Sequence, residues 1–70
     1  GITHLDLHGA RHLEAREYVL DFVLQHQNLI PLIIICGNSN QMIKIAKEIL
    51  RKNDIIFSEP RFGILRVESI

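Results

Sequence analysis

The middle of the chain reads Leu32-Ile33-Ile34-Ile35-Cys36-Gly37-Asn38-Ser39-Asn40. Its first five residues are apolar without alternation, which is typical of a central strand covered on both faces, or nearly so. The four residues from Gly37 form a turn, and a helical pattern follows over about 41–52. Either Asn38 or Ser39 can cap this helix, and Asn38 with Gln41 has the spacing of a capping box. The expected buried stripe of the helix contains Met42, Ile45, Ala46, Ile49 and Leu50.

A strand and a helix precede this segment. Residues 2–8 alternate, with Leu5 and Leu7 on one side and His4, Asp6 and His8 on the other, as in a half-buried strand. After Gly9 the period becomes that of an amphipathic helix over about 10–27. The expected buried face of this helix contains Ala15, Val19, Phe22, Val23 and His26, widened by Leu20 and Leu24.

Two further strands follow, over 55–58 and 62–67, with Glu59-Pro60-Arg61 as the expected link. The order strand–helix–strand–helix–strand–strand predicts that the first three strands run parallel through right-handed crossovers. The short link makes the last strand an antiparallel hairpin partner. We therefore expect a single α/β domain over 1–70, a two-layer sandwich with a four-stranded mixed sheet and two helices on one face.

Composition restricts the class of protein. The chain has 70 residues, with 8 Lys and Arg against 8 Asp and Glu, which suits one small domain and argues against a non-specific polyelectrolyte binder. Residues 31–70 are mildly basic, which permits a local phosphate-binding face. A single cysteine cannot close an intramolecular disulfide, and this predicts a reducing, cytoplasmic setting. The longest apolar stretch is too short to span a bilayer, so no membrane partner is expected. The first residue, Gly1, indicates a processed terminus or a domain of a longer protein.

Asp6 and His8 are the strongest candidates for catalysis. They share a strand face at the carboxyl end of the first strand, where ligands bind in open α/β sheets. A histidine can act as general acid or base near neutral pH, and Asp6 can orient its imidazole. The same two residues are also consistent with a solvated, non-functional sheet face.

The first motif resembles that of a known family. The stretch Leu5-Asp6-Leu7-His8-Gly9, followed by Glu14-Ala15, resembles the opening of the small MutS-related (Smr) domain. Leu20 and Phe22 correspond to a later apolar–aromatic pair of that family. Residues 33–37 lie where the family has an apolar strand ending in a glycine loop, and 62–67 where it has a Gly-led final strand. The resemblance implies a βαβαββ fold similar to the C-terminal domain of translation initiation factor 3.

Membership of this family implies a nucleic-acid-binding domain, often an endonuclease on RNA or DNA. The resemblance places the catalytic roles on Asp6 and His8, and brings the loop at Gly37 to the phosphate backbone. Cys36, Asn38 and Ser39 replace the family's His or Thr, basic residue and second glycine, and the final glycine cluster is reduced to Gly63. The alternative is a non-catalytic module with this fold that binds RNA, DNA or a protein partner.

A wider nucleic-acid surface is suggested by basic residues. Lys44, Lys47 and Arg51 follow one another at i, i+3 and i+7 on the second helix; such a run is usually a solvated face, here with Lys44 paired to Glu48, and nucleic-acid contact is the alternative. The four aromatic residues form no evident stacking platform. The full set of candidate nucleic-acid contacts is Gly9, Arg11, His12, Gly37, Asn38, Ser39, Lys44, Lys47, Arg51, Arg61 and Arg66.

The sequence demands no cofactor, but a divalent metal has a candidate site. His4, Asp6 and His8 form an H-x-D-x-H stripe that could supply one side of a metal site, with a plain polar face as the alternative. Metal is more relevant if DNA is cut, because water must then be the nucleophile; with RNA, His8 could deprotonate a 2′-hydroxyl. Cys36 is expected to be a buried small residue, with a nucleophilic role beside His8 as the alternative. His26 is expected at the edge of the core.

Overall fold

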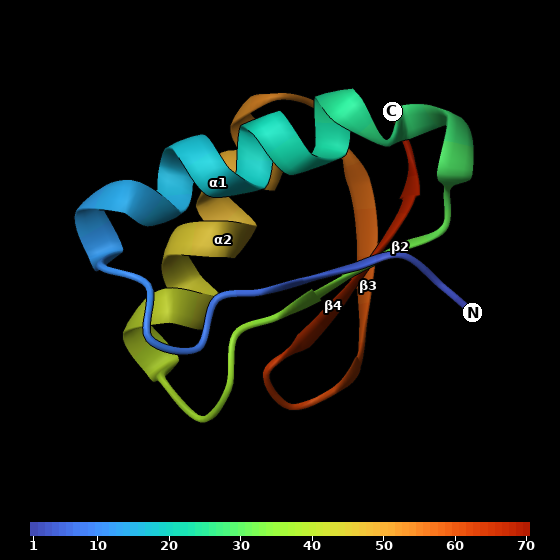
Figure 1. Ribbon diagram of the computed structural model, residues 1–70. Helices are drawn as coiled ribbons and strands as arrows, with labels where there is room; N and C mark the ends of the chain where they lie inside the picture. Colours follow the sequence, from blue (N-terminus) through green and yellow to red (C-terminus); the bar gives the residue numbers. More distant parts are fainter.

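The computed structural model describes residues 1–70 and contains two α-helices and four strands. Figure 1 shows two layers, with both helices on the same face of the sheet. None of the helices has the length and apolar character needed to cross a membrane. In chain order the elements are β1 (His4–Asp6), α1 (His12–Gln25), the 3₁₀ helix η1 (Gln27–Leu29), β2 (Leu32–Ile35), α2 (Asn40–Lys52), β3 (Ile56–Arg61) and β4 (Ile64–Ser69).

The sheet has the strand order β1-β2-β4-β3. β1 is parallel to β2, and β4 is antiparallel to both of its neighbours, β2 and β3. The first three strands therefore run in the same direction, as expected, and the last strand lies between the second and the third. The predicted α/β class and the four-stranded mixed sheet are confirmed.

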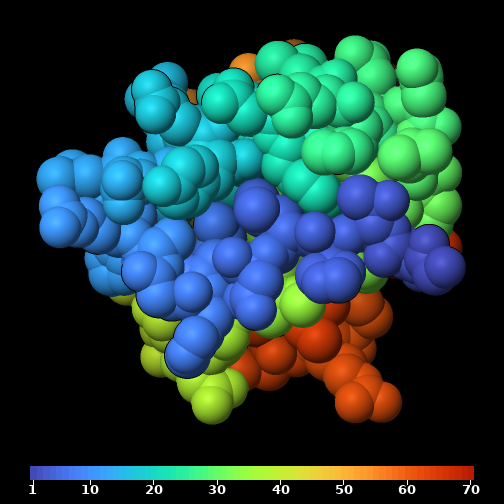
Figure 2. All heavy atoms as spheres, viewed as in Figure 1, coloured from blue at the N-terminus to red at the C-terminus, as the bar shows by residue number.

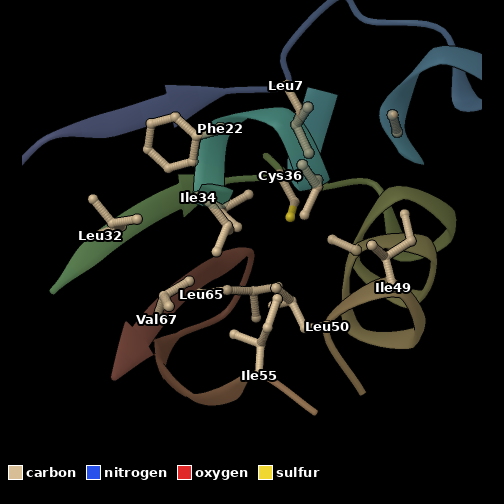
Figure 3. Packing of buried hydrophobic residues seen from close by; sticks show 14 of the residues in the cluster. Leu7, Phe22, Leu32, Ile34, Cys36, Ile49, Leu50, Ile55, Leu65 and Val67 are labelled. Atoms are coloured by element: carbon tan, nitrogen blue, oxygen red, sulfur yellow. The ribbon is translucent and has the colours of Figure 1, made fainter. Parts of the chain in front are cut away.

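The core lies between the helices and one face of the sheet, as Figure 3 shows. In β2, Leu32 and Ile34 are fully buried, whereas Ile33 and Ile35 are only partly covered. The strand is central, as predicted, but its cover is complete on one face only and partial on the other. The second face has no helical layer, and its isoleucines are shielded by neighbours in the sheet, such as Ile64 opposite Ile35.

The position of the hairpin turn also differs from the prediction. Pro60 lies within β3, and the turn is Phe62-Gly63. β3 is an edge strand with an irregular register between Ser58 and Arg61, so a proline without an N–H is tolerated there. Gly63 has φ of 82°, which places the turn at the residue that adopts a positive φ without strain.

The helix boundaries and faces differ slightly from those expected. α1 buries four residues of its predicted face, whereas Leu20 is only partly buried and Leu24 is 56% exposed. His26, also placed on that face, lies just beyond the end of the helix and is partly buried. In α2, Ile43 is buried and Ile45 only partly buried, because the face that meets α1 and the sheet is rotated from the predicted stripe. The helix cap is Ser39, whose Oγ accepts a hydrogen bond from the backbone N–H of Met42 at 3.1 Å, so the capping box based on Asn38 is not formed.

Candidate functional site

Three loops meet at one end of the sheet. β1, β2 and β3 run in the same direction, so the turn at His8-Gly9, the loop of residues 37–39 and the turn at Phe62-Gly63 all follow carboxyl ends of strands. They lie along the lower side of the molecule in Figure 1. Backbone hydrogen bonds join them, from the Leu7 N–H to the Ile35 oxygen (2.8 Å) and from the Cys36 N–H to the Gly63 oxygen (2.7 Å).

The first two loops enclose a pocket of about 380 Å³. Six of the residues proposed from sequence line it: His8, Gly9, His12, Gly37, Asn38 and Ser39. Four apolar residues that the sequence did not single out for this role complete the lining: Leu7, Ala10, Cys36 and Met42. The structure therefore brings the two glycine-containing loops together, whereas Asp6 lies outside the pocket.

Asp6 acts on the backbone of the turn. Its Oδ1 accepts a hydrogen bond from the backbone N–H of His8 at 2.8 Å, and no hydrogen bond joins it to the imidazole. Both side chains are exposed. Asp6 thus holds the turn that carries His8, and the imidazole is free to meet a ligand in the pocket.

Gly63 supports the Gly37 loop from beneath. Gly63 is buried, and a Cβ built on it would overlap the carbonyl oxygen of Gly37. Gly37 itself has φ of 72° and open space where its Cβ would be. The third loop therefore determines the position of the second, and only glycine permits this close approach.

Glu59 ties the same turn to α2. Its Oε1 lies 2.6 Å from Nζ of Lys47, and its Oε2 accepts a hydrogen bond from the Gly63 N–H at 3.3 Å. The Lys47 ammonium and then the Gly63 N–H lower the pKa of the Glu59 carboxyl, because both favour its charged form. The hairpin turn is consequently held by a backbone contact to Gly37 and by a charged link to the helix.

Cys36 is buried and only 3% exposed. Its sulfur lies among core side chains in Figure 3. Burial, and secondarily the negative charge of Glu59, raise the pKa of the thiol to about 11. A neutral thiol in the core packs as a small apolar residue, which agrees with the expected burial and gives no support to the alternative nucleophilic role.

The state of this thiol can be measured directly. We expect the folded protein at pH 8 to react with a thiol-specific disulfide reagent at least about tenfold more slowly than the same chain in denaturant. Burial lowers the fraction of thiol that is ionised and also blocks the approach of the reagent. Its rate should increase as pH rises toward the pKa of about 11. Equal rates in the folded and denatured protein would show that Cys36 is accessible.

The basic residues of α2 face away from the pocket. Lys47 pairs with Glu59, and the guanidinium carbon of Arg51 lies 5.6 Å from the centre of the Phe57 ring, so both contact β3. Lys44 is exposed and has no salt bridge to Glu48. Two of the three basic residues, Lys47 and Arg51, therefore already have partners within the fold, and none of the three lines the pocket.

The other three arginines proposed from sequence as nucleic-acid contacts lie on different elements. Arg61 is exposed at the end of β3, beside the hairpin turn. Arg66 lies on the open face of the sheet, where its Nε is 3.0 Å from Glu68. Arg11 is exposed at the start of α1, without a side-chain capping bond. Of these three, Arg61 and Arg11 flank the loops at the carboxyl ends of the strands.

A second hollow of about 260 Å³ lies between the helices and shares His12 with the first. Arg16 and Lys52, which the sequence had not suggested, contribute cations to its lining, and Leu13 is 94% exposed at the same place. His12 thus stands between the two hollows.

The histidines differ in their surroundings. No three His, Cys, Asp or Glu side chains gather closely enough to hold a metal ion, so the His4, Asp6 and His8 stripe forms no such group. Side chains two residues apart on a short strand splay, which explains the separation. His26 is partly buried, and its Nδ1 hydrogen-bonds the Phe22 carbonyl oxygen at 2.8 Å, which confirms its place at the core edge.

No protein family matches this chain, and neither a curated protein nor a solved structure matches it.

Proposed function

We propose that this chain is a nucleic-acid-binding domain of the Smr type that cleaves phosphodiesters with His8. The observation that carries the proposal is the joint lining of one pocket by His8 and by the loop of residues 37–39, which leads into α2. The element order and the stretch Leu5 to Gly9 support the resemblance to the Smr domain and to the C-terminal domain of translation initiation factor 3.

The loop supplies the chemistry that binds a phosphate. The first backbone N–H groups of α2, at Asn40 and Gln41, have no partner within the helix and lie at the positive end of its dipole. Ser39 already accepts the N–H of Met42, so this end of the helix is ordered without a ligand. The absence of a side chain at Gly37 leaves the outside of the loop open to a phosphate.

Two imidazoles reach the same pocket. On RNA, His8 takes the proton of a 2′-hydroxyl, and the 2′-oxygen attacks the adjacent phosphorus in line. The bond to the 5′-oxygen breaks, and that oxygen takes a proton from the imidazolium of His12, which also lines the pocket. Loop N–H groups stabilise the charge that develops on the phosphoryl oxygens. Asp6 contributes by holding the His8 turn.

A binding-only role is the second candidate. It is favoured by the carboxylate of Asp6, which bonds the backbone of His8 and leaves the imidazole without a carboxylate partner. Cleavage and binding assays of the wild type on single-stranded, duplex and structured RNA and DNA separate the two candidates. Binding without cleavage selects the second, and neither binding nor cleavage overturns both.

A cation added at the pocket tests where nucleic acid binds. Asn38 is exposed and lines the pocket, so we expect Asn38→Lys to tighten binding. The plot of log affinity against log salt should steepen by about 0.7 for a single strand or about 0.9 for a duplex, as for one added phosphate contact. The measurement is a salt titration followed by fluorescence anisotropy.

The matched control is Asn28→Lys. Asn28 is also exposed, but it lies in η1, before β2, at the opposite end of that strand from the loop. The Asn28→Lys substitution adds the same charge, but we expect it to leave the slope of log affinity against log salt unchanged. Equal effects of the two substitutions would mean that the pocket is not the binding site.

A further inference from the structure

Phe62 is the one aromatic residue of the chain that has neither burial nor a side-chain partner. It is 63% exposed, at the tip of the β3–β4 turn. Phe22 is buried, Phe57 lies under the guanidinium of Arg51, and the hydroxyl of Tyr18 is bonded to Glu14. Burial of an aromatic ring is favourable because it removes a large apolar surface from water. The exposure of Phe62 therefore needs a physical reason.

The ring is carried by a turn that packs against the candidate phosphate loop. The next residue, Gly63, approaches Gly37 so closely that no side chain fits between them, and its carbonyl oxygen accepts the Cys36 N–H at 2.7 Å. In Figure 2 the orange end of the hairpin and the yellow-green loop after β2 both project from the lower edge of the molecule, the hairpin to the right of the loop. Phe62 is therefore the chain neighbour of Gly63, whose backbone contacts the loop that lines the pocket.

The turn is also held in place by several contacts. Glu59 holds the Gly63 N–H and the ammonium of Lys47 together, and β3 and β4 pair on both sides of the bulge. A ring on such a support loses little conformational freedom when a flat group packs on it. Arg61, exposed and directly adjacent in the chain, adds a cation beside the ring.

We propose that Phe62 is a base-stacking contact for single-stranded nucleic acid whose backbone passes the Gly37 loop. The inference rests on the proposed function and names its substrate class. A phenyl face accepts any base, but only one that is not already stacked between neighbours in a duplex. RNA and DNA offer the same stacking chemistry, and the two are separated by the experiment.

The chain contains no tryptophan, so Phe62→Trp introduces a single indole reporter. We expect its fluorescence to be quenched by oligo-dT and oligo-U, but not by an oligomer of equal length with abasic residues, which keeps the phosphates and lacks the bases. Tyr18→Trp is the control, because Tyr18 lies on α1 and lines neither hollow. Its indole should not respond to any of these strands. The strand that half-saturates the quenching at the lower concentration is the preferred nucleic acid.

A second variant measures the contribution of stacking. Phe62→Leu keeps an apolar side chain at an exposed position, so folding is retained, and circular dichroism checks this. We expect it to weaken oligo-dT or oligo-U binding by about 5- to 150-fold and to leave binding of the abasic strand unchanged.

The outcomes separate this inference from the function on which it rests. If the wild type binds oligo-dT or oligo-U, but Phe62→Leu binds equally well and the indole is not quenched, stacking is overturned while nucleic-acid binding stands. Phe62 is then assigned to a contact with a protein partner. If anisotropy shows no binding of any strand by the wild type, the proposed function itself is overturned, and the inference falls with it.

Discussion

The Gly63→Ala variant is expected to lose about 2–4 kcal/mol of its free energy of unfolding, because it combines a strained backbone with a steric overlap. Gly63 has φ of 82°, and its Cβ would overlap the carbonyl oxygen of Gly37, which is backbone and cannot rotate away. Relief requires separation of the hairpin turn from the loop, which breaks the hydrogen bond from the Cys36 N–H to the Gly63 oxygen. Urea unfolding followed by circular dichroism measures the loss.

The chain contains a matched control for this variant. Gly9 has φ of 85°, nearly that of Gly63, but nothing lies within 4 Å of its Cβ position. Gly9→Ala therefore has the backbone strain without the overlap, and we expect a loss of about 1 kcal/mol. Equal losses in the two variants would show that the Gly63–Gly37 contact does not contribute to stability.

Replacing His8 by alanine should reduce phosphodiester cleavage by about 10²–10⁴-fold, the usual value of a general acid or base. The side chain is exposed and lines the pocket, so its removal opens no cavity in the core and the variant should remain folded. Single-turnover cleavage of an RNA oligomer measures the effect. Nucleic-acid affinity should change little, because the loop N–H groups are retained.

Two controls define the roles of the neighbouring residues. His4 is also exposed and lies on β1, the strand that leads to the His8 turn, but it does not line the pocket, so His4→Ala should cleave at the wild-type rate. Asp6→Asn keeps an oxygen that accepts the His8 N–H, and it should keep most of the activity if Asp6 acts through the turn. Full cleavage by folded His8→Ala would remove His8 from the mechanism, and a large loss in Asp6→Asn would restore a direct role for the carboxylate.

The elements and the class of fold could be predicted because their signals are local. Alternation over residues 2–8, the 3.6-residue period of the two helices and the apolar run at 32–36 are read from near neighbours in the chain. The boundaries were less accurate where two local signals compete. Proline at position 60 indicated a turn, whereas the structure keeps it in an edge strand and turns at Phe62-Gly63, where glycine provides the positive φ.

The candidate site was partly predictable for the same reason. His8 and the residues around Gly37 follow strands, and the parallel direction of those strands brings their ends together. The partner of the Asp6 carboxylate could not be predicted. His8 offers both its backbone N–H and its imidazole to this carboxylate, and only the conformation of the turn decides between them. The basic residues of α2 could be identified in the sequence. Their contacts, Lys47 with Glu59 and Arg51 with Phe57, could not, because they depend on where β3 lies.

The sequence by itself determined the order of the elements, the parallel direction of the first three strands and the identity of the two loops that form the pocket. Only the tertiary structure decided that β4 enters between β2 and β3, which brings Gly63 onto Gly37. The physical reason is the range of the interactions. Periodicity and turn propensity act within a few residues, whereas strand order and the exposure of Phe62 depend on contacts between segments more than 20 residues apart, such as that from Cys36 to Gly63.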